Sequence, residues 1–234
     1  MKEDRRVAIV TGGNRGIGYE VCKELSKAGC YVVLTSRNEQ DGKRAVSELN
    51  INNNVVYHRL DVTNKQDIAN LCDWILRTFG RLDILINNAG IYLDEGISVF
   101  DVDENIVRKT LDANFYGVFH MCRKFVPVMR QNGYGRIVNV SSGYGAMADM
   151  AGYNAAYRIS KAALNALTLI MADELRDGNI KVNAVCPGWV RTDMGGDMTP
   201  IDPETAAKDI VYFVLTGEDG PTGGFFRYKK PIQW

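Results

Sequence analysis

Short apolar runs alternate along the chain with longer segments in which apolar residues recur every three or four positions. The short runs are rich in β-branched residues, which is typical of strands, whereas the longer segments have the period of amphipathic helices. Strands are predicted at Val7–Thr11, Tyr31–Ser36, Val55–Leu60, Leu82–Ile86, Arg136–Val140, Lys181–Val185 and Phe225–Phe226. Helices are predicted at Ile17–Ala28, Gln40–Leu49, Lys65–Phe79, Glu104–Arg130, Asn154–Arg176 and Pro203–Leu215. This alternation is typical of βαβ units.

The predicted strands are apolar at nearly every position rather than at every second one. Such strands are covered on both faces, as in a parallel sheet with helices on either side. We therefore expect an α/β fold with a doubly wound parallel sheet of about seven strands and helices on both faces. The 234 residues fit one domain, and no linker, repeat or low-complexity segment divides them. We expect a single domain over residues 1–234.

Composition excludes several classes of protein. The chain has 28 lysine and arginine residues and 28 aspartate and glutamate residues, so it has no strong general attraction to nucleic acid or anionic membranes. The five cysteines contain no Cys-x-x-Cys pair, which favours buried thiols in a reducing compartment and no metal site. No apolar stretch approaches the roughly 20 residues that cross a bilayer. We expect a cytoplasmic protein with neither a nucleic acid nor a membrane as partner.

Three irregular segments follow predicted strands, at Gly90–Asp101, Gly143–Tyr153 and Pro187–Asp202. In an open α/β sheet ligands bind beyond the carboxyl ends of the strands, so these segments are the expected walls of a ligand site. They carry apolar and aromatic side chains, which favour a hydrophobic ligand but could each serve loop packing instead. These side chains are Tyr92, Leu93, Met147, Met150, Tyr153, Trp189, Met194 and Met198.

The first predicted strand ends in Thr11-Gly-Gly-Asn-Arg-Gly-Ile-Gly18, and a helical pattern begins at once. Glycines at 12, 16 and 18 let the backbone turn tightly and approach a pyrophosphate at the positive end of that helix. The alternative is a tight turn that binds nothing, but the preceding strand and following helix favour a dinucleotide site. The sheet is therefore expected to be of the Rossmann type.

Residues after the second predicted strand favour NADPH or NADP+ over NAD. An NAD site normally has an acidic residue there to bind the adenosine ribose, and Ser36 stands in its place. Arg37 follows, and Arg15 lies in the glycine turn, so two guanidinium groups could bind a 2′-phosphate. The alternative is that both arginines are solvated surface charges.

Tyr157 and Lys161 lie one helical turn apart on the same face of a predicted helix. A cation favours the phenolate form, so the lysine should lower the pKa of the tyrosine and make it a better acid. Ser142, at the end of a predicted strand, could bind a substrate carbonyl, whereas Ser141 could satisfy local backbone groups. Asn114 is polar within an apolar helix, and it either relays protons through water or bonds to neighbouring backbone.

The motifs together resemble the short-chain dehydrogenase/reductase family over essentially the whole chain, and most closely its carbonyl reductases. They are Thr11-Gly-x-x-x-Gly-x-Gly18, Asp61-Val62, Asn87-Asn-Ala-Gly90, Asn114, Ser142, Tyr157-x-x-x-Lys161, Pro187-Gly-Trp-Val-Arg-Thr-Asp-Met194 and the ending Phe225 to Trp234. The resemblance implies four catalytic residues, namely Asn114, Ser142, Tyr157 and Lys161. Tyr157 would donate a proton, Ser142 would orient the carbonyl, Lys161 would bind the nicotinamide ribose, and Asn114 would hold a water.

The resemblance also implies a cofactor site built from several segments. Its residues would be Gly12, Asn14, Arg15, Gly16, Ile17, Gly18, Ser36, Arg37, Asp61, Val62, Asn88, Ala89, Gly90, Tyr157, Lys161, Pro187, Gly188, Val190 and Thr192. Monomeric carbonyl reductases insert a helix between the catalytic serine and tyrosine, and this chain has only a short stretch there. The family's oligomer surface is then free, so a homo-oligomer, either a dimer or a tetramer, is expected.

The resulting hypothesis is an enzyme that reduces a small hydrophobic carbonyl compound with NADPH. Hydride would reach the carbonyl carbon while Tyr157 and Ser142 stabilise the charge on oxygen. Two alternatives remain open at this point: an NAD-dependent alcohol dehydrogenase that works oxidatively, and a non-catalytic protein that senses NADPH.

Overall fold

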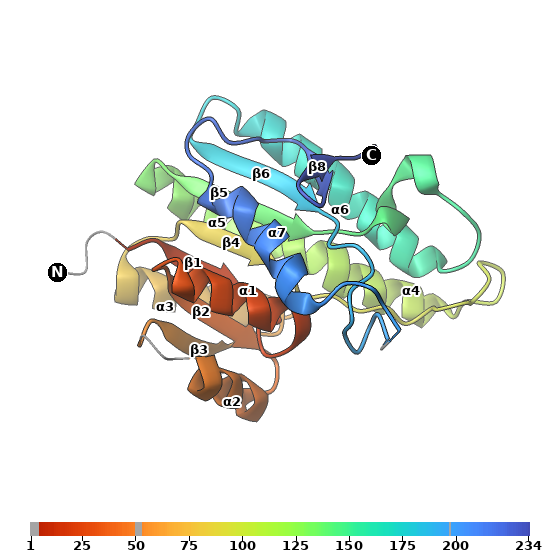
Figure 1. Cartoon of the computed structure of the whole chain (residues 1–234), viewed down its shortest axis with the longest axis horizontal. Helices are drawn as coiled ribbons and strands as arrows, with labels where there is room; N and C mark the ends of the chain where they lie inside the picture. The colour runs from red at the N-terminus through yellow and green to blue at the C-terminus, as the bar shows by residue number, and fades with distance from the viewer. Residues whose placement is uncertain (1–4, 50–52, 197) are drawn as a thin grey trace.

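The computed structural model describes residues 5–49, 53–196 and 198–234, and its centre is one sheet of eight strands (Figure 1). The strands lie in the order β3-β2-β1-β4-β5-β6-β7-β8, and all neighbouring pairs are parallel except β7 and β8. Their bounds are β1 Val7–Val10, β2 Tyr31–Ser36, β3 Val55–Arg59, β4 Ile84–Asn87, β5 Gly135–Val140, β6 Ile180–Val185, β7 Phe225–Arg227 and β8 Lys230–Pro231. The predicted doubly wound parallel sheet is confirmed, with one strand more than the seven expected.

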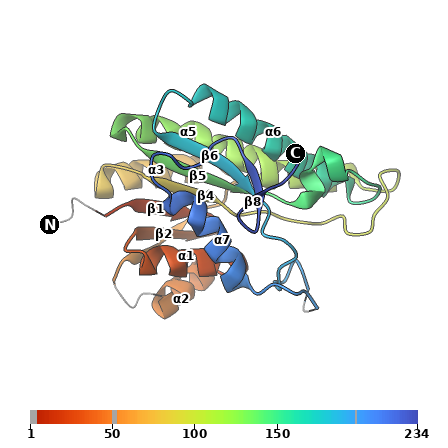
Figure 2. The same cartoon turned by 45° about the horizontal axis from the view of Figure 1, so that its top comes forward.

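Helices cover both faces of this sheet (Figure 2). One layer contains α1, α2 and α7, and the other contains α3, α4, α5 and α6. The bounds are α1 Gly16–Lys27, α2 Glu39–Leu49, α3 Lys65–Phe79, α4 Glu104–Leu111, α5 Gly117–Asn132, α6 Ala155–Glu174 and α7 Pro203–Leu215. Short helical turns η2 Gly143–Gly145 and η3 Met147–Asp149 precede α6.

Successive strand residues pack into opposite layers, which explains the nearly continuous apolar runs. In β1, Val7 and Ile9 join the core beneath α3, α5 and α6, whereas Ala8 and Val10 join the core beneath α1 and α7. Ile9 is fully buried. Burial of one such side chain stabilises the fold by about 1.5–3 kcal/mol, so a two-sided sheet needs apolar residues at every position.

The single helix predicted at 104–130 is wrong in one respect, because a π-helical turn, η1 Asp112–Tyr116, divides it into α4 and α5. A π turn accommodates one more residue than an α turn, and such turns are frequent at functional sites. Here the turn contains Asn114, which is fully buried. The interruption therefore marks the position of a candidate catalytic residue.

The second unexpected element is β8, which pairs with β7 so that Arg227 lies opposite Lys230. The two central residues of this turn, Tyr228 and Lys229, have φ angles of 53° and 61°. Turns of this kind usually contain asparagine or glycine, so the sequence carries no ordinary hairpin signal here.

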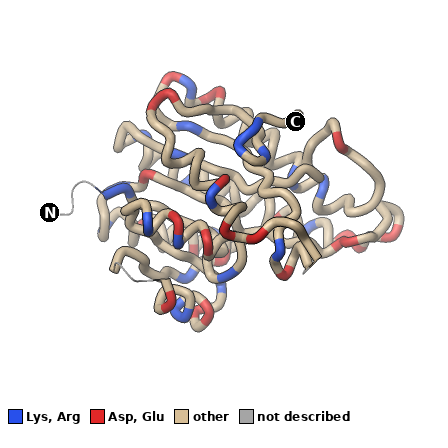
Figure 3. The backbone as a smooth tube through the Cα atoms, in the orientation of Figure 1, with Lys and Arg blue, Asp and Glu red and all other residues tan. Residues whose placement is uncertain are grey.

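Charges of both signs are interspersed along the folded chain (Figure 3). Among the described residues, none of the helices combines the length and apolar character needed to cross a membrane.

Candidate active site

A cleft of about 470 Å³ lies at the carboxyl ends of the strands, where the order reverses between β1 and β4. Ligands of open α/β sheets bind at this switch point. All but three of the residues predicted to contact a cofactor line it, namely Gly12, Asn14, Arg15, Gly16, Ile17, Gly18, Arg37, Asp61, Val62, Asn88, Ala89, Gly90, Tyr157, Lys161, Pro187 and Thr192. The lining also includes Met194, one of the expected wall residues, and residues that were not predicted to contact the cofactor, namely Leu60, Thr63, Ile91, Ala113, Val140, Ser141, Arg191 and Asp193.

The glycine turn is held against the end of β4 by Thr11 and Asn88. The Thr11 hydroxyl accepts hydrogen bonds from the backbone N–H groups of Asn88 and Ala89, both at 2.9 Å. The Asn88 amide donates back to the carbonyl of Thr11 at 2.9 Å. A β-carbon on Gly18 would lie 2.6 Å from the Asn88 side chain, so glycine is required there. These hydrogen bonds therefore fix the glycine turn to the end of β4.

The N-terminus of α1 is free to bind an anion. Its N-cap residue, Arg15, makes no capping hydrogen bond with its side chain, and the first turn contains no acidic residue. The first backbone N–H groups of a helix lack partners within the helix, and the helix dipole favours negative charge at this end. A cofactor pyrophosphate fits this position.

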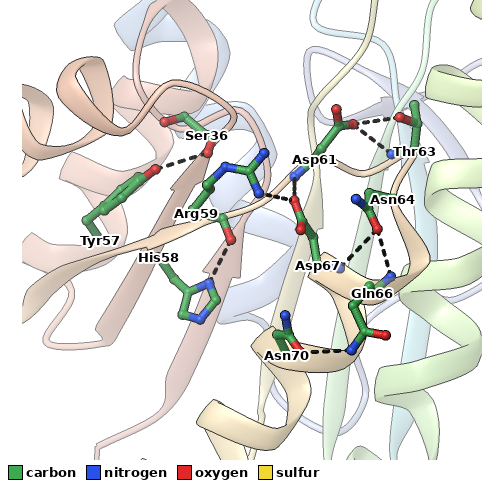
Figure 4. A network of polar contacts seen from close by, with 10 residues as sticks. All are labelled: Ser36, Tyr57, His58, Arg59, Asp61, Thr63, Asn64, Gln66, Asp67 and Asn70. Atoms are coloured by element: carbon green, nitrogen blue, oxygen red, sulfur yellow. Dashed lines mark hydrogen bonds and ion pairs between the residues drawn. The ribbon is translucent and has the colours of Figure 1, made fainter.

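Arg37 is exposed at the mouth of the cleft, while Ser36 beside it is buried and donates its hydroxyl to the Asn38 carbonyl at 2.7 Å. The Ser36 backbone carbonyl accepts a hydrogen bond from Tyr57, a contact that Figure 4 draws together with those of Asp61. One Asp61 carboxylate oxygen accepts from the Thr63 backbone at 2.9 Å and from the Thr63 hydroxyl at 2.7 Å. The Asp61 carboxylate is therefore held at the lining of the cleft.

Arg15 forms an ion pair across the cleft with Asp193 of the 187–202 segment. Both side chains are more than 70% exposed, so the pair contributes little to stability. The contact nevertheless connects the glycine turn with the segment that carries Thr192. Because of this ion pair, the Arg15 guanidinium that was expected to bind a 2′-phosphate is paired with the Asp193 carboxylate.

Tyr157 and Lys161 line the cleft, and Ser142 lies beside Tyr157. The Ser142 side chain lies within hydrogen-bonding reach of the Tyr157 hydroxyl. The Lys161 ammonium lies 5.6 Å from the centroid of the Tyr157 ring and donates to the carbonyl of Val140 at 2.8 Å. The Tyr157 ring also packs against Tyr92, with the two centroids 4.6 Å apart. The structure thus brings these three predicted catalytic side chains together.

The pKa of Tyr157 shifts in the direction opposite to our expectation. Burial raises the pKa of its hydroxyl above the ordinary value of 10, and the Ser142 hydrogen bond acts against this shift. Burial also lowers the pKa of Lys161 to about 8. The expectation considered the lysine charge alone, whereas desolvation of both groups has the larger effect.

Asn114 is hydrogen-bonded to backbone at two points. Its oxygen accepts from the N–H of Ile91 at 2.8 Å, and its amide nitrogen donates to the Ile91 carbonyl at 2.9 Å and to the Ser160 hydroxyl at 3.0 Å. Backbone bonding, one of the two alternatives, is therefore its role in this structure, and the water relay stays a prediction. The Ser141 hydroxyl donates to the side-chain oxygen of Asn165 at 2.6 Å. Ser142 is the serine whose side chain lies beside Tyr157.

Asp94 is a residue of the site that sequence reasoning missed. It is fully buried, and its carboxylate accepts from the backbone N–H groups of Ala156 at 2.7 Å and Tyr157 at 3.3 Å. Asn154, at the start of α6, makes no capping hydrogen bond with its own side chain. Asp94 thus caps the helix that carries Tyr157 from a distant segment, and no local pattern such as a capping box reveals this.

Three residues predicted to contact the cofactor lie outside the cleft lining, namely Ser36, Gly188 and Val190. Around the site, the predicted apolar walls are open to solvent: Trp189 is 63% exposed and Met147 is 69% exposed. Leu93, Met150, Tyr153, Met194 and Met198 are also exposed. Side chains of this kind can cover an apolar ligand.

The family model of the short chain dehydrogenases matches residues 6–201. Carbonyl reductase (NADPH) 1 of Sus scrofa is 33% identical over 283 residues, covering 100% of this chain and 96% of the relative. (+)-Neomenthol dehydrogenase of Capsicum annuum is 31% identical over 306 residues, covering 97% and 96%. Both alignments exceed 234 residues because the relatives contain residues that this chain lacks.

Solved structures agree with this assignment. Salutaridine reductase from Papaver somniferum superposes with a TM-score of 0.84 at 32% identity, covering 95% of this chain and 99% of that chain. The NADPH-bound carbonyl reductase from chicken fatty liver superposes with a TM-score of 0.89 at 26% identity, covering 98% and 99%. The protein therefore belongs to the short-chain dehydrogenase/reductase family, a family of oxidoreductases, and within it resembles the carbonyl reductases.

Proposed function

We propose that this protein reduces a small hydrophobic aldehyde, ketone or quinone to the alcohol, with NADPH as the hydride donor. The observation that carries the proposal is that Tyr157 lines the cleft together with Lys161 and has the Ser142 side chain within hydrogen-bonding reach of its hydroxyl. A proton donor and a dinucleotide cleft in one place are what carbonyl reduction requires. The names of the relatives, which include carbonyl reductase (NADPH) 1, support the same reaction.

NADPH, when held by the residues that line the cleft, would supply a hydride for the carbonyl carbon. Negative charge then builds on the carbonyl oxygen, and the hydroxyls of Tyr157 and Ser142 stabilise it by donating hydrogen bonds. Because burial raises its pKa, Tyr157 keeps its proton at neutral pH and is ready to donate it. An alkoxide is a stronger base than a phenolate, so proton transfer to the product stays favourable.

Several groups support NADPH as the cofactor. Arg37 is exposed at the cleft, and Arg15 can exchange its partner Asp193 for a phosphate. Ser36 leaves the end of β2 without the carboxylate that an NAD site uses. Asp61 would contact the adenine, and the N-terminus of α1 would bind the pyrophosphate.

The test is NADPH consumption with a panel of aldehydes, ketones and quinones. We expect Tyr157→Phe to lower kcat by at least about 100-fold while the Kd of NADPH changes little, because the variant loses only the proton donor. Tyr144→Phe is the matched control, since its ring lies 6.3 Å from that of Tyr157 but its hydroxyl has no part in the proposal. Equal turnover by wild type and Tyr157→Phe would contradict the proposal.

The same assays separate the two alternatives. A much lower Kd for NADH than for NADPH, with alcohol oxidation, would indicate an NAD-dependent alcohol dehydrogenase. Tight NADPH binding without turnover of any carbonyl would indicate a sensor.

The homo-oligomer expected from the sequence stays a prediction. Ile159 and Ile170 on α6 and Tyr116 on η1 are each about half exposed, at 50%, 56% and 48%. Light scattering in solution would distinguish a multiple of the 26.1 kDa chain mass from a monomer.

A further inference from the structure

The turn between β7 and β8 has an unfavourable backbone. Tyr228 and Lys229 both adopt positive φ angles, of 53° and 61°. A two-residue turn of this type favours glycine, asparagine or aspartate, because a β-carbon crowds the backbone in the left-handed region. Residues kept in such conformations cluster at functional sites, so the side chains of this turn are candidates for a specific role.

Tyr228 lies against Gly188. A β-carbon on Gly188 would lie 2.6 Å from the Tyr228 hydroxyl oxygen, 3.1 Å from the Cε1 atom of its ring, and 2.6 Å from the δ-methyl of Ile201. Gly188 also has a φ of 83°, which favours glycine. Tyr228 and Ile201 therefore meet at the surface of Gly188, where there is no room for another side chain.

Gly188 and Ile201 lie near the two ends of the 187–202 segment. These ends are joined by a parallel bridge between Val190 and Ile201, in which the Arg191 N–H donates to the Ile201 carbonyl at 2.8 Å. Between the ends, Thr192 and Met194 line the cleft. Tyr228 thus contacts the base of the segment that forms one wall of the site.

The neighbouring residue reaches the opposite wall. The Nε of Arg227 donates to the Cys186 sulfur at 3.4 Å, and the Gly143 N–H donates to the same sulfur at 3.2 Å. A β-carbon on Gly143 would overlap the Arg227 guanidinium. Gly143 directly follows Ser142. Arg227 and Tyr228 therefore contact the two segments that form opposite walls of the site.

We propose that Tyr228 is a positioning residue of the substrate site, and that its ring holds the joined ends of the 187–202 segment at a set distance from Tyr157. This inference rests on the proposed function, because the space it sets is the space for the carbonyl substrate. Removing the ring should weaken binding of the carbonyl without destabilising the fold, since glycine suits the backbone of the turn better than tyrosine.

The experiment compares Tyr228→Gly with Lys229→Gly and Tyr228→Phe. Both glycine substitutions relieve a positive φ, but Lys229 loses an ion pair with Asp209, at 3.5 Å, and a cation–π contact with Tyr212, neither of which touches the 187–202 segment. Hydrogen exchange of the Arg191, Gly195 and Gly196 amides, each bonded within the segment, reports how firmly the segment is held. KM and kcat for NADPH-dependent reduction of 4-nitrobenzaldehyde report the substrate site.

We expect Tyr228→Gly to have an unchanged or higher Tm, faster exchange at these amides, and a KM for the aldehyde raised at least about fivefold with a smaller change in kcat. Lys229→Gly and Tyr228→Phe should match wild type in exchange and KM. Unchanged exchange in Tyr228→Gly, equal effects of the two glycine variants, or faster exchange with an unchanged KM would each overturn the proposal. Hydrogen exchange is measured without a substrate, so it tests the role of Tyr228 independently of catalysis. If the proposed function is wrong, the wild type will show no turnover of the aldehyde.

Discussion

Replacing Lys161 by methionine should make the protein more stable while ending its activity. Lys161 is only 5% exposed, and burial lowers its pKa from the ordinary 10.5 to about 8. At about 1.4 kcal/mol per pH unit, this difference corresponds to about 3 kcal/mol that opposes folding while the lysine is charged. Methionine has a similar length, and its burial has no such cost.

The substitution also removes a hydrogen bond. The Lys161 ammonium donates to the Val140 carbonyl at 2.8 Å, and leaving that buried carbonyl without a partner costs about 1–3 kcal/mol. The desolvation of the charge is at least as large as this loss. The net expectation at pH 7 is a free energy of unfolding about 0–2 kcal/mol higher in the Lys161→Met variant.

The pH dependence of this difference identifies its cause. The pKa of Lys161 is lower in the folded than in the unfolded protein, so the cost is present in full below pH 8. Between pH 8 and 10.5 the unfolded chain binds the extra proton, and the cost of the lysine disappears as pH rises. The advantage of the methionine variant should therefore shrink above pH 8.

Urea unfolding of wild type and variant at matched pH values measures this difference, and the contributions of the cysteines and tyrosines cancel in it. NADPH turnover is measured in parallel. A variant that is less stable than wild type at pH 7, or a difference that does not change with pH, would refute the reasoning.

Three further predictions concern the cofactor and the position of Tyr157. Arg37→Asp should raise the Kd of NADPH at least about tenfold and leave that of NADH nearly unchanged in fluorescence titrations, and equal losses would contradict the cofactor assignment. Asp193→Asn should free Arg15 and tighten NADPH binding by up to about fivefold, a limit set by the weakness of an exposed ion pair; weaker binding would count against that role. Asp94→Ala should lower the free energy of unfolding in urea by about 1–3 kcal/mol and also lower kcat. Asp103→Ala, which removes the N-cap of α4, should lower the free energy of unfolding by about 1 kcal/mol and leave kcat unchanged. Equal kcat values for the two variants would show that Asp94 does not act on the site.

Much of the fold follows from local patterns in the sequence. The predicted bounds of α3 and α7 coincide with the observed ones, because a capping side chain or a proline and a change of period mark their starts. The glycine spacing predicts the phosphate-binding turn, since Gly18 tolerates no β-carbon. These features depend on residues that are close in sequence, which is why sequence reasoning finds them.

The features that were missed depend on contacts between distant segments. Asp94 caps a helix that begins some sixty residues later, as its bond to Ala156 shows. The π turn at Asn114 and the turn at Tyr228 have no local signal, and in each of them a residue contacts a distant segment. The pKa of Tyr157 was predicted in the wrong direction, since burial is a property of the folded site and not of helical spacing.

The most direct test of the central claim is a crystal structure with NADPH and a bound carbonyl analogue. The account predicts that the Tyr157 hydroxyl lies within about 2.6–3.2 Å of the analogue's oxygen, with the carbonyl carbon facing the nicotinamide ring. A Tyr157 hydroxyl turned to solvent, or far from a properly bound nicotinamide, would contradict it.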